Sequence, residues 1–244
     1  MFGFIKLGMR RWRSPEHYRE LQRYIAYASM RELESRGVRF AESSVLELGA
    51  GRGGYSYVLN QEASRFVACD FQADTFFPKT QIPFCIADVS RPLPFASRRF
   101  DLVYASSLVE HLAEPDTLLA EVWRVLKPGG MLYLSFPPFY SLAMVGGHNF
   151  KPFHFLGERR AIAVVNWLHG TKFRSYATCY DTWGLYPLKI DDVKRLILQA
   201  DFEVLDIYTR LSRVNTARWP AILKDLATWH VCYLAQKPLR EYVI

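Results

Sequence analysis

VLELGAGRGG, residues 45–54, is the stretch that decides the fold of this chain. Its first four residues form a largely apolar run, which predicts a short buried strand. Four glycines follow within six residues, and residues 55–60 can then start a helix. Strand, glycine turn and helix make a nucleotide-binding layout, because glycine adopts positive φ and leaves room for a ligand that a Cβ would meet. Backbone N–H groups at the helix start face such a ligand.

The spacing of the glycines narrows the choice of ligand. A Walker loop is excluded because no Gly-Lys-Ser/Thr follows, and a dinucleotide site usually has the spacing G-x-G-x-x-G. Here Gly49, Gly51 and Gly53 alternate with other residues behind the acidic Glu47. This pattern resembles the first motif of class I S-adenosylmethionine-dependent methyltransferases. A carboxylate suits that cofactor, which has an ammonium and a sulfonium group and no pyrophosphate. Taken alone, the motif also fits a tight strand–helix turn in another α/β protein.

Further strands follow the glycine turn in a regular order. Apolar runs predict them at 65–70, 82–87, 100–106 and 131–136, with little more than a turn or two at 72–81. A helix is predicted from Pro115, and Lys127-Pro-Gly-Gly130 ends it and turns the chain. Asp70 closes the second strand about twenty residues past the glycines, where α/β nucleotide folds place a ribose-binding carboxylate. The alternative for Asp70 is a solvated acid at a strand end.

Residues 44–136 together resemble one subgroup of class I methyltransferases, which acts mainly on small molecules, lipids and sugars. The resemblance rests on the glycine motif, two acids after strands, Phe-Asp-Leu-Val followed by Glu-His, and Leu-Lys-Pro-Gly-Gly, all in order. It implies an α/β fold with a Rossmann-like sheet of seven strands. This sheet is mostly parallel with an antiparallel last strand, and helices cover both of its faces. A predicted helix at 190–200 and strands at 201–208 and 229–235 complete the count.

The resemblance also implies the residues that would bind S-adenosylmethionine. Glu47 and the turn glycines would hold the methionine end, and Asp70 would bind the ribose hydroxyls. The remaining expected contacts are Phe71 against the adenine, Asp88 and Val89 at its border, and Ser106 at the end of the strand 100–106.

We expect residues 1–244 to form one methyltransferase domain with four parts. These are an N-terminal arm and helix (1–37), the cofactor-binding core (44–136), a substrate-side insertion (137–188) and the C-terminal part of the sheet (189–244). The helix of the first part is predicted from Ser14-Pro15 to a glycine cap at Gly37. The insertion is rich in aromatic residues and histidines, and a helix is predicted at 158–167. In the resembled family, the region after the fifth strand commonly shapes the acceptor pocket.

Three histidines are candidates for a general base, which an alcohol or phenol acceptor needs near neutral pH. His111 follows the strand 100–106, although in the resembled subgroup it is often structural or on the cofactor side. His148 and His154 lie in the insertion, and His154 is preferred because Phe153 and Phe155 would partly desolvate it. The alternative for each is packing among aromatic rings. No acid lies between the two, so no metal site is predicted.

Composition describes a globular protein of 244 residues with a net charge of +7. No apolar run reaches the ~18 residues that span a bilayer. Four cysteines without C-x-x-C spacing indicate reduced thiols in a cytoplasmic protein. The basic, amphipathic residues 1–13 could contact an anionic membrane surface, but a tail that covers the substrate cleft is preferred. No oligomeric state follows from these features.

The predicted reaction is O-methylation of a small molecule, a sugar or a lipid-linked glycan. RNA methylation is an alternative supported by the net charge and the aromatic insertion. Against it, Phe136-Pro-Pro-Phe139 has an apolar residue where amino-methyltransferases of nucleic acids and proteins have Asn or Asp, and it follows the fifth strand instead of the fourth. Nucleic acid is therefore an unlikely partner. The third reading is an adenosylmethionine-binding partner subunit without catalysis.

Overall fold

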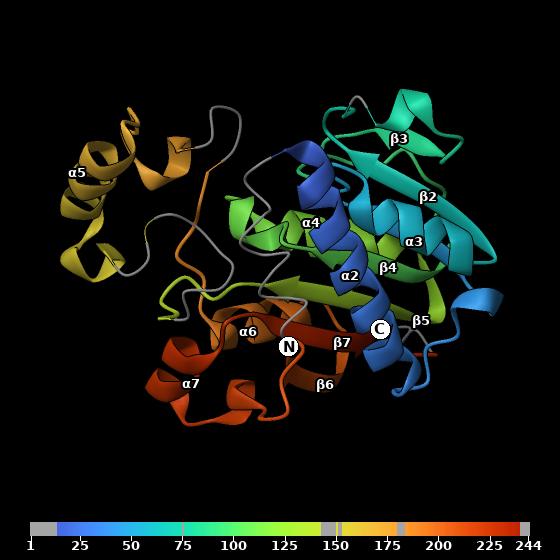
Figure 1. Cartoon of the computed structure of the whole chain (residues 1–244). Helices are drawn as coiled ribbons and strands as arrows, with labels where there is room; N and C mark the ends of the chain where they lie inside the picture. Colours follow the sequence, from blue (N-terminus) through green and yellow to red (C-terminus); the bar gives the residue numbers. More distant parts are fainter. Residues whose placement is uncertain (1–13, 75, 143–149, 151–152, 180–183, 240–244) are drawn as a thin grey trace.

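A single sheet of seven strands organises the structure, which is a computed structural model that describes residues 14–74, 76–142, 150, 153–179 and 184–239. The strand order is β3-β2-β1-β4-β5-β7-β6 (Figure 1). The strands are β1 (Ser44–Leu48), β2 (Arg65–Asp70), β3 (Phe84–Ile86), β4 (Phe100–Ser106), β5 (Leu126–Phe136), β6 (Glu203–Thr209) and β7 (Val231–Gln236). β1 to β5 pair in parallel, and β7 pairs antiparallel with both β5 and β6. The predicted fold class is confirmed.

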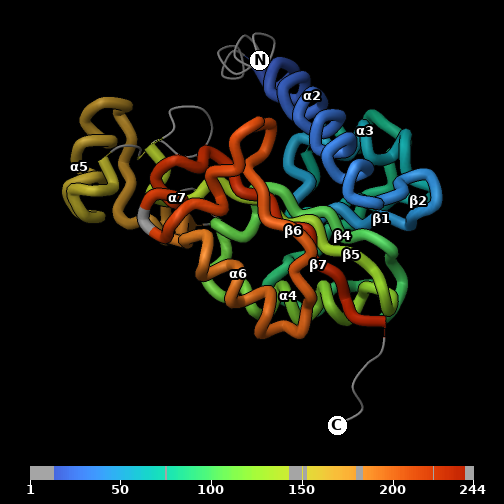
Figure 2. Tube along the Cα trace, turned by 90° about the horizontal axis from the view of Figure 1, so that it is seen from below, coloured from blue at the N-terminus to red at the C-terminus, as the bar shows by residue number. Residues whose placement is uncertain are grey.

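Helices cover both faces of the sheet, as Figures 1 and 2 show. They are α2 (Pro15–Glu34), α3 (Gly54–Glu62), α4 (Pro115–Val125), α5 (Glu158–His169), α6 (Ile190–Gln199) and α7 (Ala221–Ala227). Short 3-10 turns are η1 (Phe40–Glu42), η2 (Phe77–Lys79), η3 (Val109–His111), η4 (Phe153–Leu156), η5 (Tyr176–Thr178) and η6 (Thr216–Arg218). Among these residues, no helix is long and apolar enough to cross a membrane.

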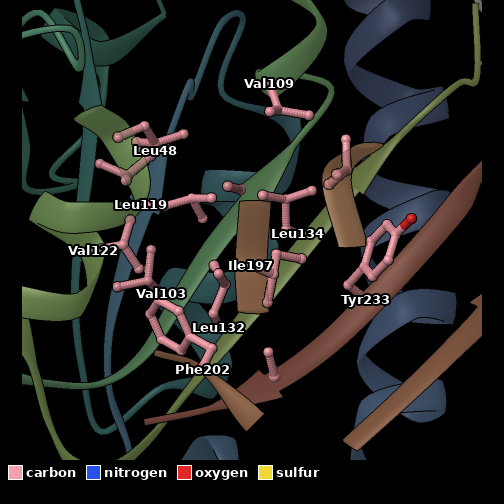
Figure 3. Packing of buried hydrophobic residues seen from close by; sticks show 14 of the residues in the cluster. Leu48, Val103, Val109, Leu119, Val122, Leu132, Leu134, Ile197, Phe202 and Tyr233 are labelled. Atoms are coloured by element: carbon pink, nitrogen blue, oxygen red, sulfur yellow. The ribbon is translucent and has the colours of Figure 1, made fainter. Parts of the chain in front are cut away.

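Alternation along the strands makes two buried layers, because successive side chains point to opposite faces of a sheet. Val103 of β4 packs with α4 and α6, and its neighbour Tyr104 packs with α2 and α3. Figure 3 shows the first layer, in which the side chains of α4, α6, β4 and β5 interdigitate. Parallel strands that are covered on both faces are buried throughout, which explains why the strands of the chain are so apolar.

The first helix begins where the sequence predicts it. The Ser14 hydroxyl accepts a hydrogen bond from the backbone N–H of His17 at 3.3 Å, and Pro15 occupies the first turn. At its other end, Val38 N–H donates to the Leu33 carbonyl, and Gly37 has a φ of +90°. Glycine takes this left-handed conformation without the steric cost that a Cβ would bring.

Two details of the fold differ from the expectation. β5 begins at Leu126, so Lys127-Pro-Gly-Gly130 lies inside the strand instead of in a turn before it. The pairing with β4 shifts there, from Phe100 opposite Leu126 to Leu102 opposite Met131. The extra residues bulge, and Gly129 takes a φ of +76° while its N–H bonds to the Lys237 carbonyl. Helix α7 was not predicted at all.

The start of α6 shows how a missing cap is replaced. Lys189 has no side-chain acceptor for the first N–H groups of the helix. Instead, Asp192 Oδ2 accepts from the Lys189 N–H at 3.2 Å, and Asp225 Oδ1 accepts from the Ile190 N–H at 2.9 Å. One acceptor lies within the helix and the other comes from α7, so the helix start depends on tertiary structure.

The insertion has a hydrophobic cluster of its own, which lies beyond the two layers of the sheet. Its buried members are Phe139, Phe150, Ala161, Ile162, Val165, Tyr176, Cys179 and Leu185. Figure 1 shows α5 set apart from the sheet. Helix α5 confirms the predicted helix and extends it to His169. The returning segment joins the end of β4, because Tyr186 N–H donates to the Glu110 carbonyl at 2.8 Å.

Candidate cofactor and active site

The glycine turn has the backbone conformation that the sequence predicts. Gly49, Gly51 and Gly53 have φ values of +75°, +52° and +77°. A Cβ on Gly53 would lie 2.3 Å from the Phe76 ring, whereas a Cβ on Gly51 would meet no atom of the described residues within 4 Å. Gly51 therefore borders open space, while Gly53 is required by close packing.

Glu47 is a buried acid at the end of β1 beside this turn. Its side chain is on the α2 and α3 face of the sheet, the residue is 2% exposed, and Oε2 accepts a hydrogen bond from the Ser56 hydroxyl at 2.5 Å. Burial raises the pKa of Glu47 to about 8, against the opposing effect of the Ser56 hydrogen bond, and the negative charge of Asp70 adds to the rise. Among the residues that the structure describes, no cation contributes to stabilising the ionised form of this carboxyl group.

Asp70 connects β2 to the same turn. Its Oδ2 accepts from the Gly51 N–H at 2.8 Å, and Oδ1 accepts from the Gln72 N–H at 3.4 Å. Burial raises the pKa of Asp70, and these backbone hydrogen bonds oppose the rise. The predicted ribose-binding carboxylate and the predicted glycine turn are therefore in direct contact.

The three residues expected around the adenine lie in different environments. Phe71, which follows Asp70, is 40% exposed. Asp88 Oδ1 accepts from both the N–H and the hydroxyl of Ser90, and these bonds lower the pKa of Asp88. Val89 is buried in the layer that contains α4 and α6, so its side chain belongs to the core.

Helix α2 reaches the glycine turn through contacts that sequence reasoning missed. Gln22 Oε1 accepts from the Gly54 N–H at 3.3 Å. Asp74 lies 3.6 Å from the Arg19 guanidinium and 3.8 Å from that of Arg52, so one acid bridges the helix and the turn. These charges come together only because α2 and the loop after β2 lie side by side in the fold, so no local sequence pattern predicts the contacts.

The candidate histidines are in contrasting positions. His111 follows β4, is half-buried, and its Nδ1 lies 2.8 Å from the Gly184 carbonyl oxygen. Since a carbonyl only accepts, Nδ1 carries the proton in the neutral ring and Nε2 is the basic nitrogen. His154 is 4% exposed and packs against Phe139 and Phe155, with ring centroids 5.4 Å and 4.2 Å away. His148 lies outside the described residues.

Comparisons with known proteins agree with this geometry. Residues 46–134 match the methyltransferase domain family. An uncharacterized methyltransferase of Mycolicibacterium vanbaalenii is 40% identical over 78 residues, which cover 32% of this chain and 30% of that relative. The chain thus spans about a third of the length of this curated relative and of a second one from Mycobacterium avium.

Solved structures match over most of the chain. An S-adenosylmethionine-dependent methyltransferase from Mesorhizobium loti covers 86% of this chain and 97% of its own, with a TM-score of 0.58 and 17% identity. The chain has the class I methyltransferase fold. The [4+2]-cyclase SpnF also has this fold, covering 92% of this chain and 82% of its own, with a TM-score of 0.54 and 17% identity. The methyltransferase fold alone therefore does not fix the reaction.

Beneath the expected active site, this methyltransferase fold holds a buried arginine. Arg210 follows β6 and is 1% exposed, and its guanidinium NH groups donate hydrogen bonds to neutral hydroxyl groups on other elements. They are Ser106 Oγ at 2.9 Å, Tyr133 Oη at 3.0 Å, Tyr55 Oη at 3.4 Å and Ser135 Oγ. The hydroxyl of Ser106, predicted to bind cofactor, thus bonds to Arg210 here. Sequence reasoning missed Arg210, which lies 104 residues from Ser106 and 155 from Tyr55.

Proposed function

We propose that this protein is an S-adenosylmethionine-dependent methyltransferase that methylates an oxygen atom of a small molecule, a sugar or a lipid-linked glycan. The observation that carries the proposal is the environment of Gly51. Its N–H is bonded to the Asp70 carboxylate, its φ is +52°, and open space lies where a Cβ would be. A ribose could approach both groups there, because no described residue occupies the space that a side chain would fill.

The residues of the turn fit this cofactor chemically. Glu47 and the turn would hold the cationic methionine end, and Asp70 would bind the ribose hydroxyls. Exposed Phe71 offers a ring face for the adenine. The bound cofactor supplies a methyl group already activated on a sulfonium. The protein's contribution is then to place the acceptor in line with that group and to exclude water.

We assign the general base to His111. It lies at the end of β4, where ligands bind in open α/β sheets. Its bond to the Gly184 carbonyl leaves Nε2 as the nitrogen that takes the proton of the acceptor hydroxyl. His154 fits this role less well, because it is buried in the cluster of the insertion. The sequence favours His154 because neighbouring rings would partly desolvate it. In the structure these rings enclose it, and His154 is only 4% exposed.

The position of Phe136 favours an acceptor other than a nucleic-acid base. Phe136 is fully buried and stacks on Tyr233, with interplanar angle 4° and centroids 6.4 Å apart. It therefore offers no acceptor for an exocyclic amine. All four cysteines are free thiols, which fits our proposal that the protein works in the cytoplasm.

Calorimetry with adenosylhomocysteine tests the cofactor site. The wild-type protein should bind, and Asp70→Asn should bind about 100-fold more weakly, because charge-assisted hydrogen bonds contribute about 1.5–3 kcal/mol each. Asp116→Asn, in the first turn of α4 on the other face of the sheet, is the matched control and should bind like wild type. Absence of binding by the wild-type protein would overturn the proposal.

Methyl transfer itself is tested with labelled S-adenosylmethionine and fractionated cell extract. Mass spectrometry of the labelled product identifies the acceptor and the methylated atom. A labelled oxygen in a small molecule, sugar or lipid supports the proposal. Label found only in RNA, or a protein that binds the cofactor and labels nothing, contradicts it in favour of the RNA or partner-subunit alternatives.

A further inference from the structure

The outer face of the insertion carries large apolar side chains in water. Phe155, Leu156, Trp167 and Leu168 are 53%, 48%, 82% and 48% exposed. Trp167 has the largest exposed fraction among the large hydrophobic residues of the described chain. Exposed apolar side chains that gather in one region of a surface mark interaction sites.

Helix α5 presents this face away from the core of the insertion. Its buried residues are Ala161, Ile162 and Val165. Trp167 and Arg160 are seven residues apart, about two helical turns, and both lie opposite the buried side. The helix is therefore amphipathic, with a mixed apolar and basic outer face.

Basic side chains surround the apolar ones. Residues 153–179 contain four cations, Arg159, Arg160, Lys172 and Arg174, and a single acid, Glu158. All four cations are exposed. Glu158 Oε1 accepts a hydrogen bond from the Tyr176 N–H at 2.6 Å, so the one carboxylate is held by the backbone of the insertion. This small segment thus supplies a large part of the net charge of the chain.

We propose that this face, the α5 surface, docks on an anionic lipid membrane. It consists of Phe155, Leu156, Arg159, Arg160, Trp167, Leu168, Lys172 and Arg174. Helices with tryptophan, phenylalanine and leucine beside arginine and lysine lie in the interface between headgroups and acyl chains. The basic residues match the negative charge of such a surface. Helix α5 lies at the edge of the molecule, as Figures 1 and 2 show. A helix in that position can contact a deformable bilayer without a complementary groove.

Docking through the α5 surface would orient the protein. The insertion contacts the end of β4 through the His111–Gly184 and Tyr186–Glu110 hydrogen bonds. The carboxyl edge of the sheet, where the glycine turn lies, would then stay close to the membrane. This inference is separate from the contact by residues 1–13 considered above, and it does not depend on methyl transfer.

Flotation of the full chain with vesicles tests the proposal. Vesicles of phosphatidylcholine with phosphatidylglycerol should bind the protein, and phosphatidylcholine alone should bind it far less. The double variant Arg159→Gln/Arg160→Gln should bind about fivefold more weakly per arginine removed. Arg39→Gln/Arg65→Gln removes two exposed arginines elsewhere and is the matched control, which should retain most of the binding.

Two substitutions of Trp167 separate insertion from simple charge attraction. Trp167→Ala should weaken vesicle binding about tenfold, because the variant lacks the aromatic side chain that the bound wild type would bury in the bilayer. Trp167→Phe should retain most binding but show a smaller blue shift of tryptophan emission with vesicles than the wild type, in which Trp167 is one of six tryptophans. Trp167 is exposed, so both variants should fold like wild type, and calorimetry with adenosylhomocysteine checks this for every variant.

Loss of binding in the α5 variants, with full binding in the matched control, supports the proposal. It is overturned if the wild type ignores anionic vesicles, if the α5 variants bind them like wild type, or if the surface binds RNA and not vesicles. Failure of vesicle binding with intact adenosylhomocysteine binding rejects the α5 surface and leaves the proposed function standing.

Discussion

The sheet and the insertion are built on different principles. In the sheet, strands and glycines follow one another in a fixed order, and each buried residue belongs to a face set by alternation. The insertion is held by a compact cluster of aromatic rings and short turns, with Phe150 and Tyr176 only 4.9 Å apart between ring centroids. The sheet thus has a regular plan that a local sequence pattern can specify, whereas the insertion depends on packing among side chains from separate positions.

The contrast shows where information resides in the sequence. A backbone conformation such as a positive φ selects glycine at a single position, so it can be predicted from the local sequence. Packing between rings from distant positions leaves no periodic pattern, so the sequence does not predict it. The same contrast suggests experiments in which one region changes and the other does not.

The largest effect is expected at the junction of the two regions. His111→Asn keeps an amide N–H near the place of Nδ1, which can still donate to the Gly184 carbonyl, but removes the basic Nε2. Turnover on the identified acceptor should fall by about 10²–10⁴-fold. Adenosylhomocysteine affinity, measured by calorimetry, should stay the same. Unchanged turnover would show that placement alone drives the reaction.

Next in size is the cost of a cavity in each core. Leu134→Ala, in β5, should lower the free energy of unfolding by about 2–5 kcal/mol. Phe150→Ala empties the cluster of the insertion, so it should raise amide hydrogen exchange in α5 and leave exchange in β4 unchanged. Mass spectrometry after deuterium exchange checks both. Equal loss of global stability in the two variants would mean that the cores unfold as one.

A smaller effect, with a defined pH dependence, is expected at Glu47. Between its ordinary pKa and about 8, the unfolded chain is ionised at this residue while the folded protein keeps the proton. The folded state thus binds more protons, and stability falls as pH rises through this window. Glu47→Gln lacks this slope and should be more stable than wild type at pH 8, on the order of 2 kcal/mol.

Urea titrations at several pH values measure this difference. The two proteins should have closer stabilities near about pH 3.5, below the ordinary pKa of a glutamate, where Glu47 is largely protonated in both states. The variant should also bind adenosylhomocysteine more weakly, because it lacks the carboxylate for the ammonium group. A parallel pH dependence in both proteins would assign the slope to other groups.

The smallest effect is expected where α6 meets the insertion. Lys189 already has the extended backbone of a helix cap, with φ −100° and ψ 162°. Lys189→Ser adds a side-chain acceptor for the first turn and should stabilise the protein by about 0.5–1 kcal/mol. Thermal unfolding measures the shift. A loss of stability would mean that the Lys189 ammonium, 5.7 Å from the centroid of the Tyr140 ring, contributes more than the cap.

Sequence alone could predict much of the fold. Glu47, Asp70 and the glycines could be selected as candidates because each lies at a strand end or in a turn whose chemistry is local, and their role in binding stays a prediction. The contacts of Arg19, Asp74 and Arg210 could not be found, because their partners come from elements far apart in the chain. For the same reason, the ring packing around His154 and the Ser106–Arg210 bond appeared only in three dimensions. The division into four parts stays a prediction.

Gly54 lets helix α2 pack closely against the start of α3. A Cβ there would lie 2.4 Å from the Gln22 side chain and 2.9 Å from the Arg19 carbonyl oxygen, so α2 is seated directly on the start of α3. A ligand that steadies the glycine turn therefore also slows the detachment of the first helix, since binding and opening are linked. Trypsin cleavage within α2, after Arg23 or Arg31, would then report ligands in mixtures without any knowledge of the acceptor. The rate of cleavage within α2 could therefore be used to screen compounds for binding to the glycine turn.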